Sequence, residues 1–224
     1  MLLTLPFLSL VGLVLPFLAW INSRQAKAHP VDDEQLPSLG AMALQAIVLQ
    51  GIIFGLAWLA ASAAGIPISW PSRLGPVPIL AAIGIVVVGM AVAWAESRRP
   101  PDPTNIIGRV LARSSAFAPQ WLALMLAAGI TEEFAYRGVL TGMLALWLEP
   151  WAAWVVSALA FGFSHCSQGW RGFLGGVAFA IALQGVVFLS GGLLLAIVAH
   201  MAYDFGAVWI SGWTERQLGS QSKT

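Results

Sequence analysis

Long apolar stretches constrain the fold of this chain more than any other feature. Seven of them, most about 20 residues long, have the length that an α-helix needs to cross a bilayer. Only 9% of the residues are charged, whereas a soluble domain has about 25%. The sequence therefore predicts an all-α, polytopic transmembrane helical bundle of about seven spans. These spans are expected near residues 2–21, 41–64, 77–95, 120–148, 151–166, 172–189 and 193–213.

The distribution of Lys and Arg predicts the orientation of the spans. Nine basic residues fall in the first, third and fifth connectors and the C-terminal tail, and only Arg73 falls on the opposite side. Cytoplasmic loops carry the excess of Lys and Arg, so we expect the N-terminus outside and the C-terminus in the cytoplasm. We expect an integral protein of the cytoplasmic membrane of a prokaryote. No basic residue precedes the first apolar stretch, which we interpret as a retained span rather than a signal peptide.

The chain is interpreted as one membrane domain, residues 1–224, because it shows no internal repeat. Residues 1–114 hold three spans without motifs, residues 115–213 hold all the motifs, and residues 214–224 form a predicted cytoplasmic tail. The net charge of +1 gives no indication of nucleic-acid binding, and the single cysteine excludes an internal disulfide.

Two small-residue patterns predict close helix contacts. They are Gly51-x-x-x-Gly55 and Gly172-x-x-x-Gly176. Glycines four residues apart place a flat surface on one helix face, where a second helix can approach closely. We expect these contacts within the monomer, with a dimer seam as the alternative.

Six ionisable residues stand inside the predicted spans. A charge at the centre of a bilayer costs about 2.5–3.5 kcal/mol on insertion scales, so such residues are candidates for a functional site. They form three helical patterns, which are Glu132-Glu133-x-x-x-Arg137, Phe161-x-x-x-His165 and His200-x-x-x-Asp204. Two acids, two imidazoles and a third acid indicate a centre that moves protons or activates water.

The first pattern suggests two different tasks for its acids. Glu133 precedes Arg137 by four residues, which is the favourable spacing for a helical ion pair. Glu132 points about 100° away and is left without this partner. A poorly solvated carboxylate is suited to act as a general base. Tyr136 shares the face of Glu132, so its hydroxyl is a candidate hydrogen-bond partner.

The two histidines come from different predicted spans. His200 and Asp204 share one helix face, so Asp204 is expected to orient His200 and fix its tautomer, with a simple helix–helix hydrogen bond as the alternative. His165 stands near the cytoplasmic end of its span. The histidines can meet Glu132 only if this span reaches inward or water penetrates, so we expect a wet cavity in the cytoplasmic half.

The three motifs, in this order on successive apolar helices, resemble the CPBP family, which includes CAAX prenyl proteases and bacteriocin-processing or immunity proteins. Its members are described as intramembrane glutamic proteases. The resemblance covers roughly residues 120–210. It implies that Glu132 and His165 activate water for attack on a peptide carbonyl and that His200 and residue 204 stabilise the oxyanion. An ionised Asp only accepts hydrogen bonds, so we expect Asp204 to serve His200, which donates to the oxyanion.

The sequence thus predicts an intramembrane endopeptidase that needs no cofactor and acts on a membrane-embedded or lipidated substrate. The predicted catalytic residues are Glu132, His165, His200 and Asp204. The predicted supporting residues are Glu133, Arg137 and Tyr136.

Three alternatives stay open at this point. One is a zinc metalloprotease, since Glu, His and Asp bind zinc, although no His-Glu-x-x-His is present. Another is a proton-coupled transporter, although no paired repeats are visible. The last is a non-enzymatic partner-binding or immunity protein.

Overall fold

A computed structural model describes residues 4–29, 31–99, 105–112 and 117–221, and within these ranges the chain is helical and contains no strand. The elements of the N-terminal half are α1 (Thr4–Ser9), η1 (Leu10–Val14), α2 (Leu15–Ala28), η2 (Asp33–Gln35), α3 (Leu39–Ala64), α4 (Pro76–Ser97) and α5 (Ile106–Ala112). Those of the C-terminal half are α6 (Pro119–Glu132), η3 (Glu133–Leu140), α7 (Thr141–Leu144), α8 (Pro150–Ser164), η4 (Cys166–Gln168), α9 (Gly169–Ser190) and α10 (Leu194–Gln221).

Five helical stretches are long and apolar enough to cross a membrane. They correspond to the first, second, third, sixth and seventh predicted spans and cover Thr4–Ala28, Leu39–Ala64, Pro76–Ser97, Cys166–Ser190 and Leu194–Gly212. Only 11% of the most apolar part of α4 is buried, so most of this helix presents its aliphatic side chains outward, as a lipid-facing helix does. The predicted all-α membrane bundle is therefore confirmed.

The two remaining predicted spans take a different form. The fourth is helical from α6 through α7 and ends at Leu144, four residues before the predicted end at residue 148. The fifth, α8, has 15 residues. At 1.5 Å per residue α8 is about 22 Å long, shorter than a hydrocarbon core of about 30 Å. The residue after α8, His165, therefore does not need to lie at a membrane surface.

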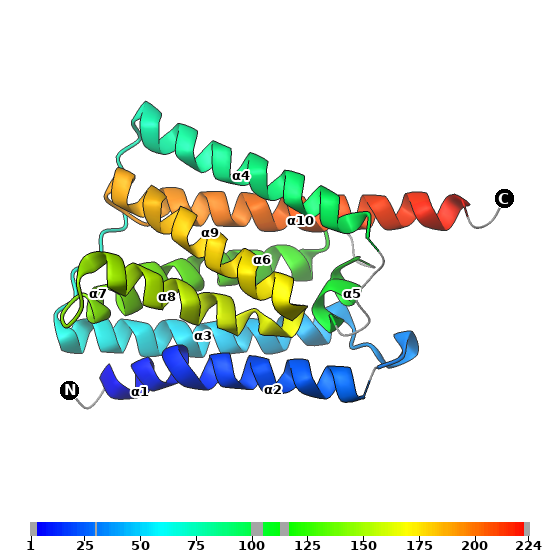
Figure 1. Ribbon diagram of the computed structural model, residues 1–224, viewed down its shortest axis with the longest axis horizontal. Helices are drawn as coiled ribbons and strands as arrows, with labels where there is room; N and C mark the ends of the chain where they lie inside the picture. The colour runs from blue at the N-terminus through cyan, green and yellow to red at the C-terminus, as the bar shows by residue number, and fades with distance from the viewer. Residues whose placement is uncertain (1–3, 30, 100–104, 113–116, 222–224) are drawn as a thin grey trace.

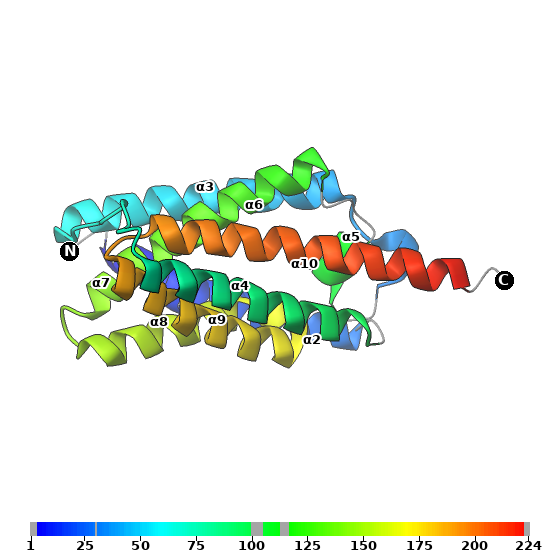
Figure 2. The same cartoon turned by 90° about the horizontal axis from the view of Figure 1, so that it is seen from above.

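The helices form a bundle in which α10 occupies a central position. Both views place α10 between α4 and α6 (Figures 1 and 2), and α10 contacts α4, α6 and α9. The start of α1 and the end of α10 lie at opposite ends of the bundle (Figure 1). We call the end where α2, α4 and α10 finish the basic end. Most basic residues of the described chain lie in or beside the helix ends there, namely Arg24, Lys27, Arg98, Arg99, Arg109 and Arg171.

Two sequence boundaries differ from the structure. Residues 214–224 were predicted to be a tail, but α10 continues as a helix through Gln221. No helix was predicted in the third connector, which contains the short helix α5, and this helix contacts α10 and η4. Both differences arise because short or polar helices carry no hydrophobic signal of a membrane span.

One of the two glycine patterns forms the predicted contact within the monomer. A Cβ at Gly176 would lie 3.1 Å from the Cα of Gly162, so α8 and α9 approach closely at these residues. The prediction for the other pattern is wrong, because Gly51 and Gly55 are exposed and a Cβ at either would meet no described atom within 4 Å. The crossing of α8 and α9 positions His165, which follows Gly162 by three residues.

Candidate functional site

The Glu-Glu-x-x-x-Arg motif lies in η3, a π-helical segment between α6 and α7. A π-helix is wider than an α-helix, and such segments are frequent at functional sites. Two hydroxyls bind the backbone carbonyl of Tyr136 inside this segment, Thr141 Oγ1 at 2.8 Å and Ser157 Oγ at 2.9 Å. These side chains tie the widened turn to α7 and α8. The motif spacing alone predicted an ordinary α-helix here.

The predicted pair of Glu133 and Arg137 is present and deeply buried. Glu133 Oε1 lies 3.2 Å from Arg137 Nη1, and the two side chains are 0% and 2% exposed. The guanidinium of Arg137 also lies over the ring of Phe161, with Cζ 4.3 Å from the ring centroid. Arg137 therefore connects η3 to α8 through a charge and an aromatic ring, which agrees with the supporting role predicted for it.

Glu133 has a second contact that the sequence did not predict. Its Oε1 accepts a hydrogen bond from His200 Nδ1 at 2.7 Å. The prediction that Asp204 fixes the tautomer of His200 differs from this geometry, because Glu133 holds Nδ1 and Asp204 faces the other nitrogen. Asp204 Oδ2 lies 3.6 Å from His200 Nε2, and Glu132 Oε2 lies 4.0 Å from the same atom. Both distances exceed that of a direct hydrogen bond.

Glu132 is bound by a residue of the N-terminal half. Gln50 of α3 donates its Nε2–H to Glu132 Oε1 at 2.8 Å. The Glu132 side chain is 17% exposed, whereas Glu133 is fully buried. Within the described chain, the side-chain partner of Glu132 is thus Gln50 and not Tyr136, whose ring packs edge-on against Phe161. The sequence signal for Gln50 was weak, because Gln45 places a second amide in the same apolar span.

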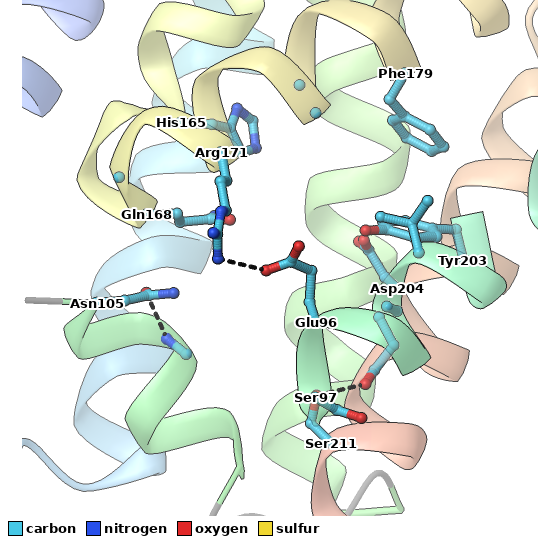
Figure 3. Close-up of a pocket in the computed structure, with 18 of the residues that line it drawn as sticks. Glu96, Ser97, Asn105, His165, Gln168, Arg171, Phe179, Tyr203, Asp204 and Ser211 are labelled. Atoms are coloured by element: carbon cyan, nitrogen blue, oxygen red, sulfur yellow. Dashed lines mark hydrogen bonds and ion pairs between the residues drawn. The ribbon is translucent and has the colours of Figure 1, made fainter. Parts of the chain in front are cut away.

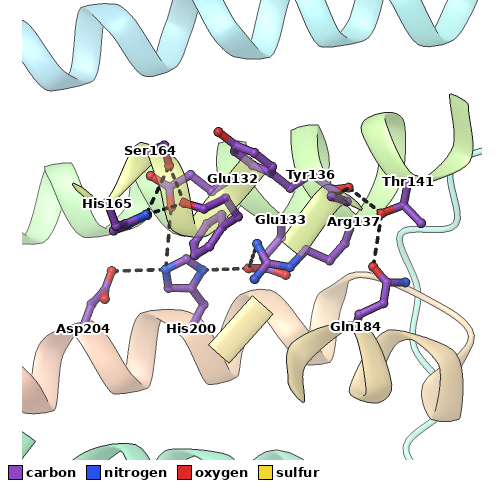
Figure 4. Close-up of polar contacts among 12 residues, drawn as sticks. Glu132, Glu133, Tyr136, Arg137, Thr141, Ser164, His165, Gln184, His200 and Asp204 are labelled. Atoms are coloured by element: carbon purple, nitrogen blue, oxygen red, sulfur yellow. Dashed lines mark hydrogen bonds and ion pairs between the residues drawn. The ribbon is translucent and has the colours of Figure 1, made fainter. Parts of the chain in front are cut away.

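His165 caps the C-terminal end of α8. Its Nδ1 lies 2.9 Å from the carbonyl oxygen of Phe161 and 3.1 Å from Ser164 Oγ. A carbonyl oxygen only accepts, so Nδ1 carries the proton and Nε2 has the free lone pair of a base. Figure 4 shows the side chains of His165, Glu132, His200 and Asp204 turned toward one space. The structure therefore brings together all four predicted catalytic residues.

A cavity of about 720 Å³ is lined by His165, His200 and Asp204 but not by Glu132, and it extends to residues at the basic end of the bundle. Its inner part is lined by Phe161, His165, Phe179, His200, Tyr203 and Asp204. Polar residues of α4, α5, η4 and α9 line its outer part, where Glu96 Oε2 lies 3.2 Å from Arg171 Nη1 (Figure 3). The predicted site therefore opens toward the end of the bundle that carries the basic residues.

Metal binding was the main alternative for this set of side chains. Among the described residues, no three His, Cys, Asp or Glu side chains converge in a way that could hold a metal ion. The expectation of a site without zinc stays a prediction, which chelation and elemental analysis test.

Comparison with known proteins supports the resemblance carried by the motifs. The family model described as type II CAAX prenyl endopeptidase Rce1-like matches residues 114–206. This range includes the six ionisable residues of the motifs and leaves out α1 to α5. Neither a curated protein nor a solved structure matches the chain. The motif-bearing region of the chain, residues 114–206, is therefore similar to type II CAAX prenyl endopeptidases of the Rce1-like kind.

Proposed function

We propose that this protein is a glutamic intramembrane endopeptidase that hydrolyses a peptide bond of a membrane-embedded or lipidated substrate. The observation that carries the proposal is the position of His200. Glu133 holds its Nδ1 at 2.7 Å, so its Nε2 faces the space between Glu132 and Asp204. Glu132, Asp204, His165 and His200 surround this space. Together they supply the general base and acid that hydrolysis needs and a hydrogen-bond donor to the oxyanion. The family match supports proteolysis within the membrane.

Glu132 and His165 are proposed to activate the water. Glu132 Oε1 is bound to Gln50, which leaves Oε2 as the oxygen that faces His200 Nε2 at 4.0 Å. In the proposed step Glu132 takes a proton from water while the Nε2 lone pair of His165 orients it. The water oxygen bonds to the carbonyl carbon of the substrate. When the carbon–nitrogen bond breaks, the proton held by Glu132 passes to the leaving nitrogen.

His200 is proposed to stabilise the oxyanion. A protonated imidazole bound at Nδ1 by Glu133 presents its Nε2–H to the site, and a donor fixed before the reaction stabilises developing negative charge without reorganisation. Asp204 Oδ2 at 3.6 Å from Nε2 supports the positive charge of the imidazole. This arrangement explains how an acid can stand at position 204, because the donor is His200 and not residue 204.

The access route also suggests a topology. The cavity opens at the basic end, and basic residues gather on the cytoplasmic side of membrane proteins. We therefore propose that the substrate segment reaches the site from the cytoplasm. With seven spans, including the helical stretch from α6 to α7 and the short α8, the N-terminus would lie outside. This topology fits the cytoplasmic membrane of a prokaryote.

A reconstituted assay tests the function. The purified protein is placed in liposomes with a panel of membrane-anchored peptides, with and without a C-terminal isoprenoid, in water enriched in ¹⁸O. Cleavage by the parent protein should add one ¹⁸O atom to the new carboxyl group, as measured by mass spectrometry. Glu132→Gln should give no product while it still inserts and folds. Equal cleavage by the parent and by Glu132→Gln would contradict the mechanism.

A further inference from the structure

Gln50 belongs to a part of the chain that carries none of the motifs. It stands in the middle of α3, and it lies outside residues 114–206, where the family match is found. Nevertheless its Nε2 is 2.8 Å from Glu132 Oε1, across 82 positions of sequence. The apolar helix α3 packs against α6 and η3, the two segments that meet at Glu132 and Glu133. The contact thus joins the N-terminal half to the proposed general base.

The chemistry of the two groups fixes the direction of this bond. An ionised carboxylate has no proton to donate, so the Gln50 nitrogen must face it and the Gln50 oxygen must face away. That oxygen, Oε1, is buried and has no partner among the described residues. Buried polar atoms in folded proteins nearly always have a partner. Of the two polar atoms of the Gln50 amide, Nε2 is thus bound to Glu132, whereas Oε1 has no partner among the described residues.

We propose that Gln50 is a positioning residue for Glu132. It binds Glu132 Oε1 and thereby directs Glu132 Oε2 toward His200 Nε2. One carboxylate oxygen is then fixed, and the other faces the space where the water and the substrate would react. This inference rests on the proposed function of Glu132 as a base. It adds α3 to the active site, and it explains how the carboxylate of Glu132, whose distance of 4.0 Å to His200 Nε2 is too long for a direct hydrogen bond, is held in one orientation inside an apolar bundle.

A purely structural role is the competing interpretation, because amides in membrane helices often join neighbouring helices. The two roles have different consequences. A structural amide affects the amount of folded protein and its melting temperature. A positioning amide affects kcat per folded molecule and leaves KM nearly unchanged, because the substrate still binds while the carboxylate of Glu132 is less well oriented.

The test uses Gln50→Leu with Gln45→Leu as its matched control. Gln45 stands on the same helix with an exposed side chain, so the control makes the same change of residue away from the site. Each variant is measured in liposomes with a peptide that the parent cleaves, and rates are divided by the folded fraction. Gln50→Leu should lower kcat roughly 10- to 100-fold, the usual effect of losing a group that orients a reactive residue, with KM within about twofold. Gln45→Leu should match the parent.

A second variant tests the direction of the hydrogen bond. In Gln50→Glu, a protonated Glu at position 50 can still donate to Glu132, but an ionised one repels it. Its activity should therefore be low at neutral pH and recover as the pH falls, whereas Gln50→Leu, which has no hydrogen-bond donor at position 50, should show no such recovery.

The outcomes separate this inference from the proposed function. If the parent cleaves and Glu132→Gln does not, but Gln50→Leu equals Gln45→Leu in kcat, the positioning role is overturned while the function stands. The positioning role is also overturned if the Gln50 variants lose activity only in proportion to their loss of folded protein and Gln50→Glu does not recover activity at low pH. If the parent cleaves as fast as Glu132→Gln, the proposed function itself fails.

Discussion

Glu133 Oε1 accepts a hydrogen bond from His200 Nδ1 at 2.7 Å, which joins the motif of η3 to that of α10. The same oxygen lies 3.2 Å from Arg137 Nη1. Glu133 Oε1 therefore contacts two groups in the buried core, the Nδ1–H of His200 and the guanidinium of Arg137. Glu132 lies beside it in sequence but is partly exposed, and its direct hydrogen bond among the described residues comes from the neutral amide of Gln50. Two adjacent acids thus have different surroundings, and we expect them to have different effects when changed.

Arg137→Ala should destabilise the protein strongly. It leaves Glu133 buried with only His200 as its partner, and removing one member of a buried pair costs about 3–5 kcal/mol. It also removes the contact with the Phe161 ring. The melting temperature in detergent should fall clearly.

The control for this prediction is the exposed pair of Arg99 and Glu96, which are 2.6 Å apart with side chains 48% and 41% exposed. Arg99→Ala should cost about 0–1 kcal/mol. If Arg137→Ala melts like the parent and is inactive, Arg137 acts on the substrate instead.

His165→Ala should lower kcat by about 10²- to 10⁴-fold, the contribution of a positioned acid or base. The expected reason is the loss of the Nε2 lone pair that faces the site. His29→Ala is the matched control, because His29 is exposed at the end of α2 and should leave the rate unchanged. Peptide cleavage in liposomes gives both rates. Equal rates for the two variants would remove His165 from the mechanism.

Gly162→Ala should lower activity by displacing α8 from α9. An added Cβ would meet the side chain of Val177 and would lie 2.8 Å from the backbone oxygen of Phe173, which cannot move without moving α9. In Gly175→Ala the added Cβ has no described atom within 4 Å, so this variant should resemble the parent. Melting curves and cleavage rates distinguish the two. A Gly162→Ala protein as stable and active as Gly175→Ala would contradict the close packing of these helices.

Chelators should leave the activity intact. The mechanism uses Glu132 and His165 to activate water, so dialysis against EDTA or phenanthroline is expected to change neither the rate nor the melting temperature. Elemental analysis should find well under about one zinc per chain, because a structural or catalytic zinc site binds one ion with three or four protein ligands. Stoichiometric zinc that is lost together with activity would make the protein a metalloprotease.

The sequence predicted which ionisable residues lie near one another better than it predicted their contacts. The length of the apolar stretches placed α3 and α4 within two residues, because the thickness of the membrane constrains each span separately. Charges inside apolar spans identified Glu132, His165 and His200, because their burial is costly wherever they lie. The bond between Glu133 and His200 depends on how α10 packs against η3, which no local pattern encodes.

Two other features could not be read from the sequence. In the π-helical η3, the carbonyl of Tyr136 accepts hydrogen bonds from Thr141 and from Ser157, and Ser157 comes from the separate helix α8. Nothing in the sequence distinguishes Gln50 from an amide that joins two membrane helices, because its partner Glu132 stands 82 residues away. Both features depend on tertiary contacts rather than on residue spacing.

The central claim is that Glu132 is the base that activates water for peptide cleavage, and a single-turnover measurement tests it most directly. Enzyme in excess is mixed with a membrane-anchored peptide that the parent cleaves, and the first-order rate is followed for the parent, Glu132→Gln and Glu34→Gln. Glu34 is an exposed acid far from the motif in sequence, so it controls for the loss of one carboxylate. We predict that Glu34→Gln cleaves like the parent and that Glu132→Gln binds the peptide but shows no cleavage. Cleavage by folded Glu132→Gln at the parent rate would contradict the account.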